Sequence, residues 1–163
     1  MARKATAPNA AAKAPKAPKA PKTPKAPKAP KAPKESARKA EASLRGPAAL
    51  GPYSHAVWSG RQLFLSGQTP VDPATGELVS GDVEAQTHRA FDNLQLVLED
   101  AGLSMDDVVK CNVYLTDMAN FAAMNQAYKE RFTAPYPART TVAVAGLPLG
   151  AQVEIELVAR RPG

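Results

Sequence analysis

The sequence predicts an α+β fold: a single six-stranded mixed sheet with two helices on one face, preceded by a long basic segment. Three observations lead to this prediction. Residues 83–101 repeat apolar side chains at helical spacing, two runs near the C-terminal end alternate like strands, and the predicted elements follow the order β-β-β-α-β-α-β-β. Helices with one apolar stripe each can both bury it against the same sheet.

Residues 1–46 form a basic, low-complexity segment. They hold 13 Lys and Arg against 2 acids, a net charge of +11, whereas residues 47–163 carry a net charge of −5. From Lys13 to Pro33 the chain repeats seven K-x-P triplets, which bury nothing and favour polyproline II. We therefore expect 1–46 to be a disordered tail, 47–50 a linker and 51–163 the folded domain.

Two interpretations of this tail remain open. The lysines from Lys13 to Lys34 would line one edge of a semi-rigid rod, which could bind DNA or RNA non-specifically through their phosphates. The segment has no aromatic side chain to stack on bases, so base specificity is not expected. The alternative is a solvated spacer that contributes only solubility.

The folded part is expected to begin at Gly51 with a hairpin, in which Ser59-Gly60 joins AVW to QLFLS. A turn-rich stretch, TPVDPATGE, leads to a brief strand at Leu78-Val79. Asp82 is a natural N-cap for a helix that ends near Gly102. Its apolar stripe comprises Val83, Thr87, Ala90, Phe91, Leu94, Leu98 and Ala101.

A strand over residues 109–115 and a second helix follow. In the strand, the side chains expected to face the core are Val109, Cys111, Val113 and Leu115, and those expected to face away are Lys110, Asn112 and Tyr114. Asp117 is expected to cap the second helix, whose buried stripe comprises Phe121, Met124, Tyr128 and Phe132. Pro135 and Pro137 end it.

The last two strands, within Pro137–Ala159, bring charged groups into otherwise strand-like runs. Val153, Ile155 and Leu157 form an apolar face, so Glu154 and Glu156 point the other way. In the preceding run Arg139, Thr141 and Ala143 alternate with Thr140, Val142 and Val144. Arg139 and the carboxylates are therefore expected to share the sheet face away from the helices, as a site or as an ordinary solvated surface.

Other chemical machinery is sparse. The two histidines, His55 and His88, and the single Cys111 have no metal-ligand spacing, so neither a metal nor a cofactor is expected. We expect His88 on the surface and Cys111 as an inert buried thiol. One cysteine and no long apolar run favour a cytoplasmic protein without membrane association.

Three separated motifs resemble the RidA (YjgF, L-PSP) family: GPYSHAV at 51–57, LFLSGQTPVDPATGELVSGD at 63–82 and PARTTVAVAGLPLGAQVEIELVA at 137–159. The resemblance implies a homotrimer that packs through the sheet face opposite the helices, with clefts between subunits. It also implies cofactor-free hydrolysis of 2-imino acids or their enamines, such as 2-iminobutanoate and 2-iminopropanoate, to 2-oxo acids and ammonia.

The resemblance also implies residue roles. Arg139 of PART would bind the substrate carboxylate, and Glu154 of VEIE would position or activate water. The further substrate-binding positions are Tyr53, Ser66 and Thr141, the last through its backbone. His55 stands where the family often has glutamine. Two other functions are considered. One is a nucleic-acid-associated trimeric scaffold that acts through its basic tails. The other is a ribonuclease, which is disfavoured because the sequence lacks the catalytic histidine pair usual in metal-free RNA cleavage.

Overall fold

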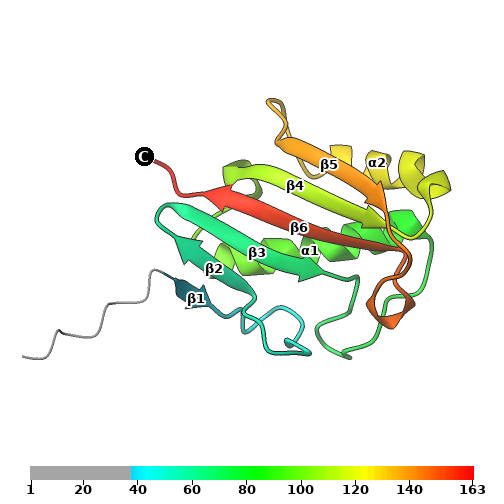
Figure 1. Cartoon of the computed structure of the whole chain (residues 1–163), viewed down its shortest axis with the longest axis horizontal. Helices are drawn as coiled ribbons and strands as arrows, with labels where there is room; N and C mark the ends of the chain where they lie inside the picture. The colour runs from blue at the N-terminus through cyan, green and yellow to red at the C-terminus, as the bar shows by residue number, and fades with distance from the viewer. Residues whose placement is uncertain (1–37) are drawn as a thin grey trace, which may run out of the picture. The chain divides into compact units, whose positions relative to one another are not determined.

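The computed structural model describes residues 38–163 and has a six-stranded sheet in the order β1-β2-β3-β6-β4-β5 (Figure 1). All neighbouring strands are antiparallel except the parallel pair β4 and β5. This confirms the predicted α+β class with a mixed sheet. The elements are β1 Lys39–Glu41, β2 Ala56–Ser59, β3 Gln62–Gln68, α1 Val83–Asp100, β4 Val108–Leu115, α2 Phe121–Lys129, β5 Ala138–Ala143 and β6 Val153–Arg160.

The two helices bury their apolar stripes on the same face of this sheet, as predicted. Asp82 caps α1 by accepting a hydrogen bond from the Ala85 amide at 3.0 Å. The stripe of α1 and the inward side chains of β6 meet in one core, in which Phe91, Leu94 and Ile155 have no exposed surface. The other face of the sheet has no helix over it in the described part of the chain (Figure 1).

The second helix is shorter than its apolar pattern indicated. Asp117 caps a 3-10 turn at Met118–Asn120, and α2 then runs only to Lys129. Phe132 lies beyond the helix but is still buried, because its ring packs edge-on against Phe91 at 5.6 Å. The predicted buried residue is therefore confirmed, although the element that presents it is a loop.

One of the six strands is not the predicted one. Leu78 forms only an isolated bridge with Val71, so the expected strand at Leu78-Val79 is wrong. The sixth strand is Lys39–Glu41, which pairs with β2 at the sheet edge. Residues 39–46 are consequently part of the fold rather than tail or linker. They escaped prediction because a charged three-residue edge strand has no apolar alternation.

A register shift in β4 changes one predicted core residue. The pairing with β6 is irregular between Val108 and Lys110, so Val108 is buried and Val109 is exposed. From Cys111 onward the predicted alternation is confirmed, with Cys111, Val113 and Leu115 fully buried. A bulge adds one residue to a strand, so the alternation of inward and outward side chains is shifted before the bulge and unchanged after it.

The predictions for residues 1–37, including the K-x-P repeat and its order or disorder, lie outside the described residues. Among the helices of residues 38–163, none is long and apolar enough to cross a membrane.

Candidate functional site

Arg139 lies on the helix-covered face of the sheet. Its backbone is paired with buried Cys111 on β4, and residues paired across neighbouring strands point to the same face. The guanidinium stacks over the Tyr128 ring at 4.4 Å, and Nη1 donates to Asn125 Oδ1 at 2.9 Å. Stacking and hydrogen bonding to α2 therefore fix the direction of this side chain.

The guanidinium lines a cavity of about 300 Å³ beside α2, together with Asn125, Tyr128, Lys129, Tyr136 and Pro137. Burial raises the pKa of Tyr128 to about 12, so its ring stays neutral beneath the cation. Within residues 38–163, only Nη1 of Arg139 has a hydrogen-bond partner. The remaining guanidinium donors can bind an anion in the cavity.

Glu154 lies on the opposite face. It pairs with Tyr114, which alternates with the buried residues of β4 and points away from the helices. The expectation that Arg139 and Glu154 share one face of a single chain is therefore wrong. Thr141 accompanies Arg139, because it pairs with buried Val113, and its hydroxyl is buried without a partner in the described part of the chain.

The Glu154 carboxylate is half-buried and forms no hydrogen bond or ion pair with any described residue. Burial raises its pKa above the usual range, and the negative charge of Glu156 raises it further. Asn112 and Tyr114 hold Glu156 in place by donating to its Oε1 at 2.6 and 3.0 Å. Glu154 is thus a carboxylate that takes up a proton more readily than a free glutamate and whose oxygens have no partner among the described residues, as a general acid or base requires.

A cavity of about 370 Å³ opens beside Glu154, and its walls include Tyr53, Ser66, Gly67 and Thr69. The structure brings together three of the predicted site residues here: Tyr53, Ser66 and Glu154. Ser66 is engaged, since its hydroxyl donates to the Ser54 carbonyl at 2.7 Å. The Tyr53 hydroxyl accepts from the Leu50 amide at 3.2 Å.

Gly67 is a site residue that the sequence prediction omitted. It lies where β3 bulges between Leu65 and Gln68, and a Cβ at this position would collide with the Glu154 carboxylate. Only glycine leaves room for that side chain in its present position. The signal was present, because a glycine inside an otherwise apolar strand often marks a bulge or a close approach.

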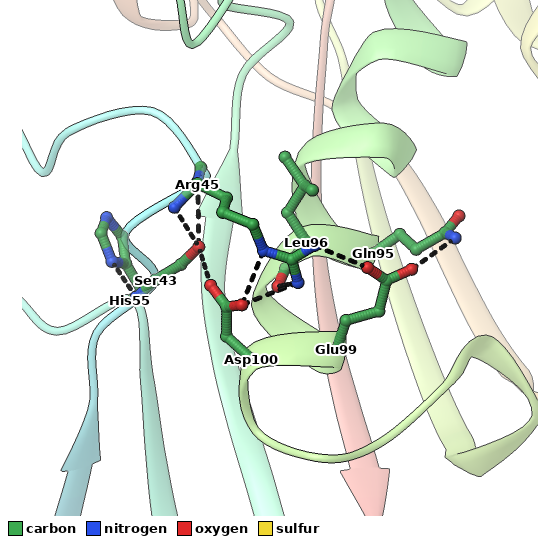
Figure 2. Close-up of polar contacts among 8 residues, drawn as sticks. Ser43, Arg45, His55, Gln95, Leu96, Glu99 and Asp100 are labelled. Carbon is green, nitrogen blue, oxygen red and sulfur yellow. Dashed lines mark hydrogen bonds and ion pairs between the residues drawn. The ribbon is translucent and has the colours of Figure 1, made fainter.

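A segment that we call the strap, residues 43–50, forms one wall of the cavity through Leu50. Figure 2 shows how it is attached to the C-terminal end of α1. Ser43 Oγ donates to Asp100 at 2.7 Å, and Arg45 forms ion pairs with Asp100 and Glu99 at 2.7 and 3.1 Å. The hydrogen bond from Ser43 and then that from Arg45 lower the pKa of Asp100.

His55 attaches the strap at a second point. Its Nδ1 accepts from the Ser43 amide and its Nε2 faces the Pro47 carbonyl, both at 2.9 Å. Because the Ser43 amide can only donate, Nδ1 accepts and Nε2 is the ring nitrogen that donates to the Pro47 carbonyl. The histidine that replaces the family's glutamine is therefore buried and holds the strap rather than entering the cavity.

Cys111 and His88, the other two residues considered from the sequence, lie outside both cavities. Burial raises the pKa of Cys111 to about 12, which keeps it a thiol, as expected for a core cysteine. His88 is partly exposed at the surface, and its Nδ1 accepts from Arg131 at 3.3 Å, just beyond the end of α2. Among residues 38–163 there is no group of three His, Cys, Asp or Glu side chains that could hold a metal.

Comparisons with known proteins identify the class. The family described as Endoribonuclease L-PSP matches residues 43–161. Protein DfrA of Myxococcus xanthus is 50% identical over 125 residues, 76% of this chain and 95% of that protein. The 2-iminobutanoate/2-iminopropanoate deaminase of Capra hircus is 43% identical over 122 residues, 75% of this chain and 89% of that protein.

The solved structure of E. coli TdcF with bound serine is similar in fold, with a TM-score of 0.71 and 40% identity. The match covers 76% of this chain and 99% of that chain. A six-stranded mixed sheet with two helices and these motifs defines a RidA-like α+β protein. The chain belongs to the RidA/YjgF/L-PSP family.

Proposed function

We propose that this protein is a cofactor-free hydrolase that converts 2-imino acids, or their enamine tautomers, to 2-oxo acids and ammonia. The proposed substrates are 2-iminobutanoate and 2-iminopropanoate, the compounds named for the 43%-identical deaminase of Capra hircus. The observation that carries the proposal is Glu154, an unpartnered, half-buried carboxylate with a raised pKa that lines a cavity.

The reaction needs a base and then an acid at one place. Glu154 accepts a proton from water while the water oxygen bonds to the imine carbon and the C=N π electrons move to nitrogen. The protonated carboxyl then returns that proton to nitrogen, which gives a carbinolamine. Glu154 next takes the proton of the new hydroxyl and passes it to the amino nitrogen, so the C–N bond breaks to release ammonia as the C=O bond forms. Water and imine thus become ammonia and ketone, with Glu154 unchanged. A raised pKa suits a group that works in both directions.

Arg139 is proposed to bind the substrate carboxylate. Its planar donors match a carboxylate in a bidentate way, and stacking on Tyr128 leaves their orientation fixed before substrate arrives. The bound serine of E. coli TdcF supports a carboxylate site in this family, because serine has the same carboxylate next to a nitrogen-bearing carbon. Tyr53, Ser66 and the Thr141 backbone are proposed to complete the binding surface.

Arg139 and Glu154 must come from different copies of the chain if both act on one substrate. In one copy they lie on opposite faces of the sheet. A homotrimer packed through the uncovered sheet face, as the family resemblance implies, would place the Glu154 cavity of one subunit against the α2 edge of the next. We propose this assembly, in the cytoplasm as the single cysteine suggests.

The direct test is imine hydrolysis by the purified protein. An amino-acid oxidase generates 2-iminopropanoate from alanine or 2-iminobutanoate from 2-aminobutanoate, and semicarbazide captures the imine that survives. We expect the protein, in chelator-treated buffer, to lower the captured imine and raise 2-oxo acid and ammonia in equal amounts. Unchanged capture at micromolar protein would overturn the proposal.

A second function is proposed for the N-terminal segment. Eight lysines from Lys13 to Lys34 provide a dense cationic stretch, and three such segments on a trimer would bind polyanions together. We expect DNA retention by the full chain that falls steeply with salt, varies little with base sequence and disappears when residues 1–37 are removed. Salt-independent or sequence-selective retention would contradict it.

A further inference from the structure

We infer that a second cavity, beside the one that Glu154 lines, binds the side chain of the imino acid. This inference rests on the function proposed above. The cavity measures about 130 Å³ and lies between the strap, through Pro47 and Ala48, and the turn that carries Val71 and Pro73. Nothing in the proposed reaction requires it, because water, imine carbon and carboxylate are all accounted for elsewhere.

The two cavities adjoin at Gly67. Leu50, Tyr53, Gly67 and Thr69 line both of them. A substrate whose imine carbon lies at Glu154 is therefore next to the walls that the two cavities share. The imine carbon bears three groups: the nitrogen, the carboxylate and the side chain. With the carboxylate on Arg139 and the nitrogen at Glu154, the side chain is the group left to enter the smaller cavity.

The walls select for an uncharged and compact side chain. None of the residues that line the smaller cavity carries a charge, and burying an unpaired charge is strongly unfavourable. An apolar cavity of roughly 150 Å³ holds a benzene-sized molecule, so this one has room for about four or five carbons. The subsite thus favours aliphatic imino acids from alanine-derived to leucine-derived and excludes those with a side-chain carboxylate.

The strap wall is fixed before substrate arrives. Ser43 is tied to Asp100 on α1, and His55 bonds to the backbone at both Ser43 and Pro47. These contacts set the position of Ala48, which follows Pro47 directly. Ala48 therefore determines how far the cavity extends under the strap. A larger side chain at residue 48 should shorten it without altering Glu154 or Arg139.

The chain offers a matched pair of variants that test this geometry. Ala48 lines the cavity, whereas Ala49 next to it is also exposed and does not line it. The probes are imines generated by amino-acid oxidases from alanine, leucine and glutamate. We expect the wild type to hydrolyse the leucine-derived imine at least tenfold better than the glutamate-derived one, as measured by kcat/KM. Ala48→Leu should lower the leucine-to-alanine ratio of kcat/KM about tenfold, and Ala49→Leu should leave this ratio unchanged.

The outcomes separate this inference from the proposed function. Two results would reject the subsite and leave the proposed function standing, provided that the alanine-derived imine is hydrolysed. One is an unchanged leucine-to-alanine ratio of kcat/KM in Ala48→Leu. The other is equal hydrolysis of the glutamate-derived and leucine-derived imines by the wild type. No hydrolysis of any probe by the wild type rejects both. Circular dichroism melting curves of both variants show whether a lower leucine-to-alanine ratio results from unfolding. A lower ratio at an unchanged melting temperature supports the subsite.

Discussion

The Glu154 carboxylate occupies the space that a side chain at Gly67 would need. Gly67→Ala should therefore displace Glu154 from its cavity while leaving its ionisable group in the protein. We expect kcat/KM for imine hydrolysis to fall at least tenfold, because a misplacement of about 1 Å at a reacting group can cost 100-fold. Steady-state kinetics with the alanine-derived imine measures the effect.

Gly146→Ala is the matched control for this variant. A Cβ at Gly146 meets no atom within 4 Å, and its backbone does not need the left-handed conformation. Its kcat/KM should remain within twofold of wild type. If Gly67→Ala is equally active, the position of Glu154 does not matter for the reaction.

The charge of Glu156 should set the pH range of activity through Glu154. Burial and then Glu156 raise the pKa of Glu154, so the ionised base forms only at higher pH than for a free glutamate. Glu156→Gln keeps an acceptor for Asn112 and Tyr114 but removes the charge. We expect the acidic limb of the kcat/KM profile to move to lower pH. A profile that stays in place would show that another group controls it.

The same raised pKa predicts how Glu154→Gln affects folding stability. Folding favours protonated Glu154, so its stabilising contribution is complete below the unfolded pKa, near 4.5, and is lost as the pH rises through the higher folded value. At pH 7 the variant should melt at or slightly above the wild-type temperature while kcat falls. At low pH this advantage should vanish.

Binding of the substrate carboxylate is expected to depend on the paired, planar donors of Arg139 as well as on its charge. Arg139→Lys keeps a cation but loses bidentate geometry and the stack on Tyr128. Hydrogen bonds between charged groups are worth about 1.5–3 kcal/mol, so kcat/KM should fall roughly 10- to 100-fold, and Arg139→Ala should be worse. Arg160→Lys, at an exposed position of β6, serves as the control. Full activity in Arg139→Lys would place carboxylate binding elsewhere.

A site shared between copies predicts complementation. Arg139→Ala and Glu154→Gln should each be nearly inactive alone. After co-refolding in equal amounts, about one cleft in four of a random trimer joins an intact Arg139 to an intact Glu154. We expect about a quarter of wild-type activity, with light scattering used to verify the trimer. Mixtures no more active than the separate variants would contradict the two-copy site.

Two truncations separate the tail from the fold. Deleting residues 1–37 should leave the melting temperature and imine hydrolysis unchanged. Deleting 1–46 also removes β1 and the contacts of Ser43 and Arg45 with Asp100, so the melting temperature should fall by several degrees. A hydrogen bond to a charged group contributes about 1.5–3 kcal/mol. Equal melting of the two truncated proteins would show that the strap contacts add nothing.

Much of the fold follows from side-chain periodicity, because a difference in hydrophobicity between the two faces of an element shows which face is buried. The stripe of α1 and the inward side chains of β6 have strong contrast, and both predictions are confirmed. The strand that carries Arg139 lacks this difference between its faces, since Thr140 and Thr141 lie on opposite faces and neither face is clearly apolar. Periodicity groups Arg139 with Thr141 but does not say which face the helices cover.

The strap and Gly67 show a second limit. The strap is held in part by polar contacts between residues more than 50 positions apart, such as Ser43 with Asp100, and no local pattern encodes such pairs. Gly67 matters because of a side chain on β6 that only the strand pairing brings near. The sequence pattern identified Glu154 through the family motif, but the space that Glu154 occupies is a tertiary property.

The position of β6 in the sheet has a consequence for synthesis of the protein. This strand is the last in chain order, yet it runs between β3 and β4 and completes the middle of the sheet (Figure 1). A nascent chain that has emerged only as far as β5 has two strands, β3 and β4, with unpaired edges, and its α1 lacks the β6 side chains that share its core. The domain should therefore acquire protease resistance only after Arg160 leaves the ribosome, and chains that stop before Val153 should aggregate through those open edges.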